Sequence, residues 1–164
     1  MKAKEITLSA ALIALTIVIL YLNLLLPIST ISILTLASLL IPVALIRGSM
    51  KSAILVYISS SIIGFFILPI NTILLYILFF GIYGIVKFYI EKINKLPLEI
   101  FIKILFFNIV FFLSFFIFKS FIAIEITKLP IELFWIIAQI VFLVFDYALT
   151  SLISFYLERI HPKL

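Results

Sequence analysis

The chain has 164 residues, of which 66% are hydrophobic and 12% charged, with a formal net charge of +5 and a mean hydropathy of +1.46. Soluble domains usually contain about 25% charged residues, so this composition excludes an ordinary soluble fold and predicts an integral membrane protein. The absence of cysteine excludes disulfides, a lipoprotein anchor, thiolate metal sites and cysteine nucleophiles.

Six apolar runs follow one another along the chain, and each is about long enough to cross a bilayer as a helix. Pro27 and Pro69 end the first and third runs, and Pro42 lies inside the second, where it predicts a kink. Further apolar runs follow the first, so we expect the first run to remain as a span and not to be a cleaved signal peptide. The sequence predicts a single domain over residues 1–164, with spans at about 6–26, 29–46, 52–68, 72–90, 100–118 and 133–157.

The positive charges alternate between the gaps that separate these runs. Ten of the twelve lysine and arginine residues lie at the two ends of the chain or near the second and fourth gaps, which a chain of six spans places on one side of the membrane. Only Lys119 and Lys128 lie in a gap on the other side. Short loops rich in lysine and arginine stay in the cytoplasm. We therefore predict an all-α bundle of six transmembrane helices in a bacterial cell membrane, with both termini cytoplasmic. Cations beside span ends suit anionic headgroups, so the expected partner is the lipid bilayer and not nucleic acid.

Asp146 is the most informative single residue, because it lies near the middle of the last apolar run. A carboxylate at the centre of a span costs about 2.5–3.5 kcal/mol, so Asp146 needs a polar partner or a water-filled cavity. Asn108 lies at a similar depth in the fifth run, and Lys103 enters that run from its cytoplasmic end. The polar residues that share one face of the last helix are Gln139, Asp146, Thr150 and Ser154.

These residues have two readings. The functional reading is a polar cavity for a ligand, or a proton site. The structural reading is a buried Asp–Asn or Asp–Lys pair that holds two helices together. Residues 119–132, the longer outer gap, could cover such a cavity as a lid or could be an inert connection.

The residues required for catalysis are scarce. His161 is the only histidine, so a histidine cluster for a metal or a general base is excluded, and no glycine-rich phosphate loop is present. We therefore expect no enzymatic activity, no cofactor and no metal.

In the first run, Ala10 and Ala14 form an A-x-x-x-A pattern, a spacing that lets a second helix approach closely. This stretch, from Met1 through Leu15, is similar to the first helix of the substrate-binding S components of bacterial energy-coupling factor transporters. The layout of six helices with cytoplasmic termini resembles that family as well. The resemblance implies that Ala10 and Ala14 contact a membrane-spanning coupling subunit, with ATPase subunits as further partners.

The sequence therefore favours a subunit that captures a small-molecule substrate for such a transporter. Asn108 and Gln139 would supply hydrogen bonds, and Asp146 would set the charge preference. Because the outer half has few polar groups, the expected nutrient is small and largely apolar. Two alternatives remain open, namely a membrane scaffold or assembly subunit of the cell envelope, and a proton-coupled carrier that uses Asp146.

Overall fold

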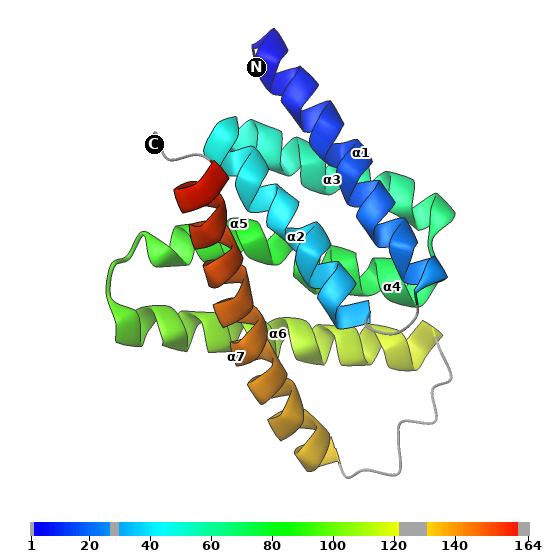
Figure 1. Cartoon of the computed structure of the whole chain (residues 1–164). Helices are drawn as coiled ribbons and strands as arrows, with labels where there is room; N and C mark the ends of the chain where they lie inside the picture. Colours follow the sequence, from blue (N-terminus) through cyan, green and yellow to red (C-terminus); the bar gives the residue numbers. More distant parts are fainter. Residues whose placement is uncertain (1, 27–29, 122–130, 161–164) are drawn as a thin grey trace. The chain divides into compact units, whose positions relative to one another are not determined.

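The structure is a computed structural model, and it describes residues 2–26, 30–121 and 131–160 (Figure 1). Within these ranges every regular element is a helix. The α-helices and the two π-helical segments are α1 (Ala3–Leu25), α2 (Thr30–Arg47), α3 (Met50–Ile67), α4 (Ile70–Leu75), η1 (Tyr76–Phe80), α5 (Gly81–Glu91), α6 (Leu96–Phe121), α7 (Ile131–Phe155) and η2 (Tyr156–Ile160).

The prediction of an all-α chain with six membrane-length helices is confirmed. Six helices in the described ranges are long and apolar enough to cross a membrane, with α4, η1 and α5 forming the fourth and α7 with η2 the sixth. These helices are consistent with a multi-pass membrane protein. Pro42 lies inside α2 without ending it.

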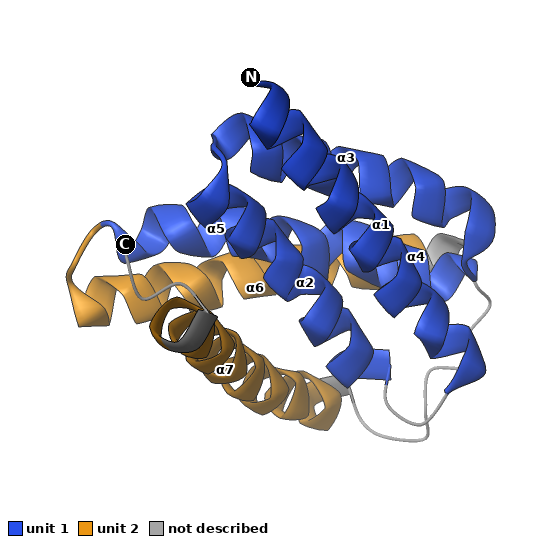
Figure 2. Cartoon of the chain, turned by 45° about the horizontal axis from the view of Figure 1, so that its top comes forward, with its two compact units in different colours: residues 1–92 blue, residues 93–164 orange. Residues whose placement is uncertain are grey.

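The chain forms two compact units, residues 1–92 and residues 93–164, coloured separately in Figure 2. We call them unit 1 and unit 2 and describe each by itself. Unit 1 contains the first four membrane-length helices, and unit 2 contains the last two.

Unit 1 is built around α2, which packs against α1, α3 and α5. Buried residues cover α2 from Leu34 to Ala44, whereas α1 buries one narrow stripe at helical spacing. That stripe of α1 consists of Ser9, Leu12, Thr16, Leu20 and Asn23. The buried hydroxyls of Ser9 and Thr16 donate to backbone carbonyls four residues earlier on the same helix, so small polar residues pack inside this unit without unpaired hydroxyl protons.

Two glycines allow close approach inside unit 1. A Cβ atom on Gly84 of α5 would lie 2.8 Å from Cδ of Pro42, so the backbone of α5 fits against the proline ring of α2. A Cβ atom on Gly81 would lie 2.8 Å from the ring of Tyr57 on α3. Small residues at such contacts let membrane helices pack tightly.

The tyrosine that packs against Gly81 also explains the π-helical segment η1. In a π-helix the wider turn changes the partners of backbone carbonyls. The hydroxyl of Tyr57 donates to the carbonyl of Ile77 inside η1 at 2.9 Å, and the hydroxyl of Tyr76 lies 2.8 Å from Oγ of Ser60. Two hydroxyl contacts from α3 therefore hold η1 in place.

Unit 2 begins with a turn in which Asn94 has a φ of 52°. Asparagine adopts this left-handed conformation more readily than most residues. Helix α6 then starts at Leu96, four residues before the expected span, because Pro97 falls in the first turn, where its missing N–H costs no helical hydrogen bond. Glu99 in the same turn suits the positive end of the helix dipole.

Candidate functional site

The polar residues of unit 2 lie along the contact between α6 and α7. Four pairs of side chains form this contact. From one pair to the next, the residue number on α6 decreases while the residue number on α7 increases. The two helices therefore run antiparallel. The pairs are Phe111 with Phe134, Asn108 with Gln139, Phe107 with Phe142, and Lys103 with Asp146.

Asn108 is the centre of an amide cluster in this contact. Its Oδ1 atom accepts a hydrogen bond from Nε1 of Trp135 at 2.8 Å and another from Nε2 of Gln139 at 2.7 Å. Its Nδ2 atom donates to the carbonyl of Ile104, one turn earlier on α6. Trp135 and Gln139 are four residues apart and so share one face of α7. Both lone pairs of the Asn108 oxygen are thus used inside the protein.

Gln139 keeps hydrogen-bonding capacity that Asn108 does not have. Within the described residues its side chain makes only the bond to Asn108, so its carbonyl oxygen and its second N–H remain available. The side chain is half-buried. An amide with an open acceptor and donor can bind a ligand through complementary groups.

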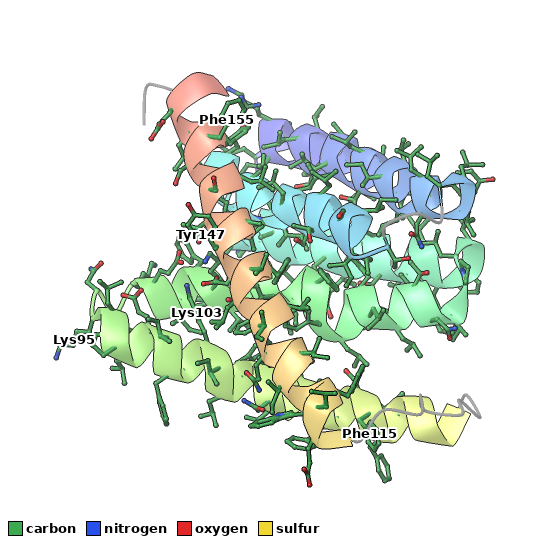
Figure 3. The ribbon with its side chains drawn as sticks, turned by 60° about the horizontal axis from the view of Figure 1, so that its bottom comes forward. Lys95, Lys103, Phe115, Tyr147 and Phe155 are labelled. Carbon is green, nitrogen blue, oxygen red and sulfur yellow. The ribbon has the colours of Figure 1, made fainter. Side chains whose placement is uncertain are left out.

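Asp146 forms an ion pair with Lys103, its Oδ2 atom lying 3.0 Å from the lysine Nζ. The side chains are 19% and 9% exposed, respectively, so water screens the contact only partly. Figure 3 shows both helices with their side chains, labelling Lys103 on α6 and Tyr147, the residue after Asp146, on α7. The positive lysine neutralises the carboxylate that the sequence placed inside a span.

The predicted polar face of α7 divides in the structure. Gln139 and Asp146 contact α6, whereas Thr150 and Ser154 are exposed. Thr150 donates to the backbone carbonyl of Asp146. The buried stripe of α7 continues instead through Leu149, three residues after Asp146.

Ala10 and Ala14 lie on the exposed side of α1, away from the stripe that α1 buries in unit 1. Ala11 beside them is exposed too, while the C-terminal half of the same face carries larger residues, Val18 and Leu22. The N-terminal half of α1 therefore presents a small-residue surface to its surroundings.

Sequence reasoning missed polar contacts in unit 1. Nδ2 of Asn23 on α1 donates to Oγ1 of Thr72 on α4 at 3.1 Å, and both residues are more than nine-tenths buried. Oδ1 of Asn23 has no hydrogen-bond partner among the described residues. The signal in the sequence was Asn23 itself, an amide inside the first apolar run. The contacts of Tyr57 with Ile77 and of Tyr76 with Ser60 could not be predicted from the sequence. Tyrosine is common in membrane proteins as an interface residue, so its presence does not indicate a buried hydrogen bond.

Unit 1 also has a shallow apolar groove of about 310 Å³. It includes none of the residues that the sequence singled out. Its lining consists of Ser61, Ile62, Phe65, Phe66 and Ile77. The hydroxyl of Ser61 donates to the carbonyl of Tyr57, so it is already engaged.

In the part of the chain that the structure describes, no group of three histidine, cysteine or acidic residues is placed to hold a metal ion. The predicted lid, residues 119–132, lies almost entirely outside the described side chains, and His161 lies outside the described residues.

Comparison with models of protein families, with curated proteins and with solved structures found no match to this chain. The functional argument therefore depends on the contacts described above.

Proposed function

We propose that this chain is a multi-pass protein of the bacterial cytoplasmic membrane that captures a small, largely apolar nutrient for an energy-coupling factor type transporter. The observation that carries the proposal is the amide cluster of Asn108, Trp135 and Gln139 between α6 and α7. The cluster leaves the Gln139 amide with an open acceptor and donor beside a tryptophan ring. A ligand with an apolar body and one or two polar groups suits that arrangement.

The ion pair next to the cluster bears on the charge of the ligand. Because Lys103 neutralises Asp146, a charged ligand would meet no net opposite charge from this pair. The proposed nutrient is therefore neutral. Hydrogen bonds to Gln139 then provide orientation, and the apolar contacts with α6 and α7 provide most of the affinity.

In this proposal Ala10 and Ala14 contact the coupling subunit, because their exposed small side chains let another helix approach α1 closely. ATPase partners supply the energy. Both termini lie in the cytoplasm, as the distribution of lysine and arginine favours.

The partner contact is tested by purifying the tagged full chain from its bacterial host and identifying bound proteins by mass spectrometry. We expect a membrane-spanning coupling subunit and ATPase subunits with the unmodified chain. The double variant A10L/A14L should lose them, because the larger side chains hold a second helix away. The control A11L changes an exposed alanine that lies about 100° from Ala10 around the helix, and it should keep them.

The ligand site is tested on the same preparation by analysing the small molecules released on denaturation. The unmodified chain should release a neutral compound, and Q139A should not. The control I140A changes an exposed neighbour of Gln139 on α7 and should release the compound as the unmodified chain does. Purified protein with neither partner nor small molecule would contradict the proposal.

A second candidate function is a non-catalytic scaffold or assembly subunit of the cell envelope. The observation that favours it is that Asp146 and Asn108 both have partners within unit 2, as a structural pin requires. The variant Q139A distinguishes the two functions, because within the described residues the Gln139 side chain makes only the bond to Asn108. A scaffold keeps its cellular activity in this variant, whereas the proposed ligand site loses uptake.

A further inference from the structure

All charged residues of unit 1 come from three short segments of the sequence. No charge occurs between Glu5 and Arg47 or between Lys51 and Lys87. The charged residues comprise six cations and two carboxylates, which gives these segments a formal charge of +4. They are Lys2, Lys4, Glu5, Arg47, Lys51, Lys87, Glu91 and Lys92.

The fold brings the three segments to one end of unit 1. Asn23 and Thr72 are in contact at the opposite end of unit 1. Lys4 lies nineteen residues before Asn23 along α1, and Glu91 lies nineteen residues after Thr72 along the helix formed by α4, η1 and α5. Both residues are therefore at a similar distance from this contact. Figure 1 shows the start of α1 at the top, the turn between α2 and α3 below it and the end of α5 further down, spread along the left side of this unit. We call this region the basic end.

The turn between α2 and α3 is held at the same level by the packing of α2 on α5. Pro42 contacts Gly84, and Arg47 follows Pro42 by five residues while Tyr89 follows Gly84 by five. Lys51 lies just across the turn, where Oγ of Ser49 accepts the hydrogen bond from the backbone of Ser52.

The carboxylates of the basic end are already engaged. Glu91 pairs with Lys87 at 2.7 Å, and Glu5 accepts a hydrogen bond from the backbone N–H of Lys2. Besides Lys2, whose backbone N–H is the donor to Glu5, three lysines have exposed side chains and, within the described residues, no carboxylate partner. They are Lys4, Lys51 and Lys92.

Aromatic rings hold one of these ammonium groups beside an apolar surface. Nζ of Lys92 lies 4.4 Å from the ring centre of Phe88 and 5.7 Å from that of Tyr89. A cation over aromatic rings is stabilised but not neutralised, so an anion can still bind it. Beyond this level the exposed surface of α1 and α3 is apolar, with Val18 and Ile58 among the exposed residues.

We propose that the basic end binds the headgroups of anionic phospholipids, whose acyl chains cover the adjacent apolar surface. The phosphodiester of such a lipid supplies a negative charge to pair with the three lysines. Its acyl chains contact the adjacent apolar surface, which a free anion cannot do. The site requires only that unit 1 lies in a membrane, so it is independent of any nutrient or coupling subunit.

The test uses the full chain in vesicles of equal parts phosphatidylcholine and phosphatidylglycerol. The measured quantity is the affinity of the protein for spin-labelled phosphatidylglycerol relative to spin-labelled phosphatidylcholine. We expect a preference for the anionic lipid. One lysine near an anionic surface contributes up to about a fivefold preference, so the triple variant K4Q/K51Q/K92Q should lose most of the preference, with Lys2 and Arg47 retaining the remainder.

The matched control K4R/K51R/K92R keeps the charges and should keep the preference. Circular dichroism verifies that the variants remain helical, which is expected because all three side chains are exposed. An equal affinity of the unmodified chain for the two lipids, or an undiminished preference in the glutamine variant, would overturn the proposal.

Inorganic phosphate distinguishes a lipid site from a site for a soluble anion. At equal ionic strength it should displace no more phosphatidylglycerol than sodium chloride does. Selective displacement by phosphate would assign the site to free phosphate and overturn the lipid assignment.

Discussion

The ammonium group of Lys103 and the carboxylate of Asp146 face each other across α6 and α7, in segments with few other charges. In such surroundings the loss of one partner leaves the other charge poorly solvated. For buried pairs this costs about 3–5 kcal/mol, whereas exchange of the whole pair for apolar residues is often nearly neutral. Because Asp146 keeps some exposure, we expect the lower part of that range.

We therefore expect D146L and K103M each to lower the free energy of unfolding by about 3 kcal/mol, and the double variant to lose less than either. The measurement is reversible unfolding of the purified chain in mixed micelles. Y147F serves as control, since Tyr147 is the exposed neighbour of Asp146. Losses that add up in the double variant would show that the two charges are not coupled.

Trp135 offers a direct probe of the amide cluster, because it is the only tryptophan in the chain. Its indole N–H donates to Oδ1 of Asn108. In N108L this acceptor is lost and the indole loses a polar neighbour, so the fluorescence emission should move to shorter wavelength. The control N71L changes an exposed amide in unit 1 and should leave the spectrum unchanged. An unchanged spectrum in N108L would contradict the contact.

At the scale of residues, the sequence indicated that Asp146 needs a partner but left Asn108 and Lys103 both open. The choice depends on the register of α6 against α7, which the packing of Phe107 on Phe142 helps to set. Hydropathy carries no information on that register. For the same reason the sequence did not predict the contact between the ring nitrogen of Trp135 and Asn108.

Helix η1 is the element that the sequence did not predict. Its residues, Tyr76–Phe80, are as apolar as the α-helical residues around them. The π-helical turn depends on a partner from another helix, because the Tyr57 hydroxyl bonds the Ile77 carbonyl while the Tyr57 ring fills the space beside Gly81. The approximate bounds of the six long helices, by contrast, followed from the lengths of the apolar runs.

We expect Y57F to lower the free energy of unfolding by about 1 kcal/mol, since the Ile77 carbonyl loses a donor. G81A should cost about 1–3 kcal/mol, because its methyl group overlaps the Tyr57 ring. Unfolding in mixed micelles measures both, with Y21F as a control, since Tyr21 is exposed and makes no hydrogen bond within the described residues.

The two changes should also be coupled. In a Y57A background the ring is absent, so the added methyl group of G81A should cost less than it does alone. The same cost in both backgrounds would contradict the proposed origin of η1.

For the whole molecule, composition and the lengths of the apolar runs predicted the helical class and the number of membrane-length helices, because lipid demands long apolar helices. It did not predict the division into two compact units, residues 1–92 and 93–164. The turn between the units resembles the other short polar gaps in composition, so no sequence signal separates it from them. The side on which each turn lies stays a prediction from the lysine and arginine pattern.

The topology is tested most directly by labelling single cysteines, since the chain contains no cysteine of its own. In intact cells a membrane-impermeant maleimide should label N71C, in the first turn of α4. It should label K51C and K95C only after the membrane is opened, because these turns are predicted to face the cytoplasm. Labelling of K51C or K95C in intact cells would contradict the six-span arrangement, and with it the proposed location of the ligand site.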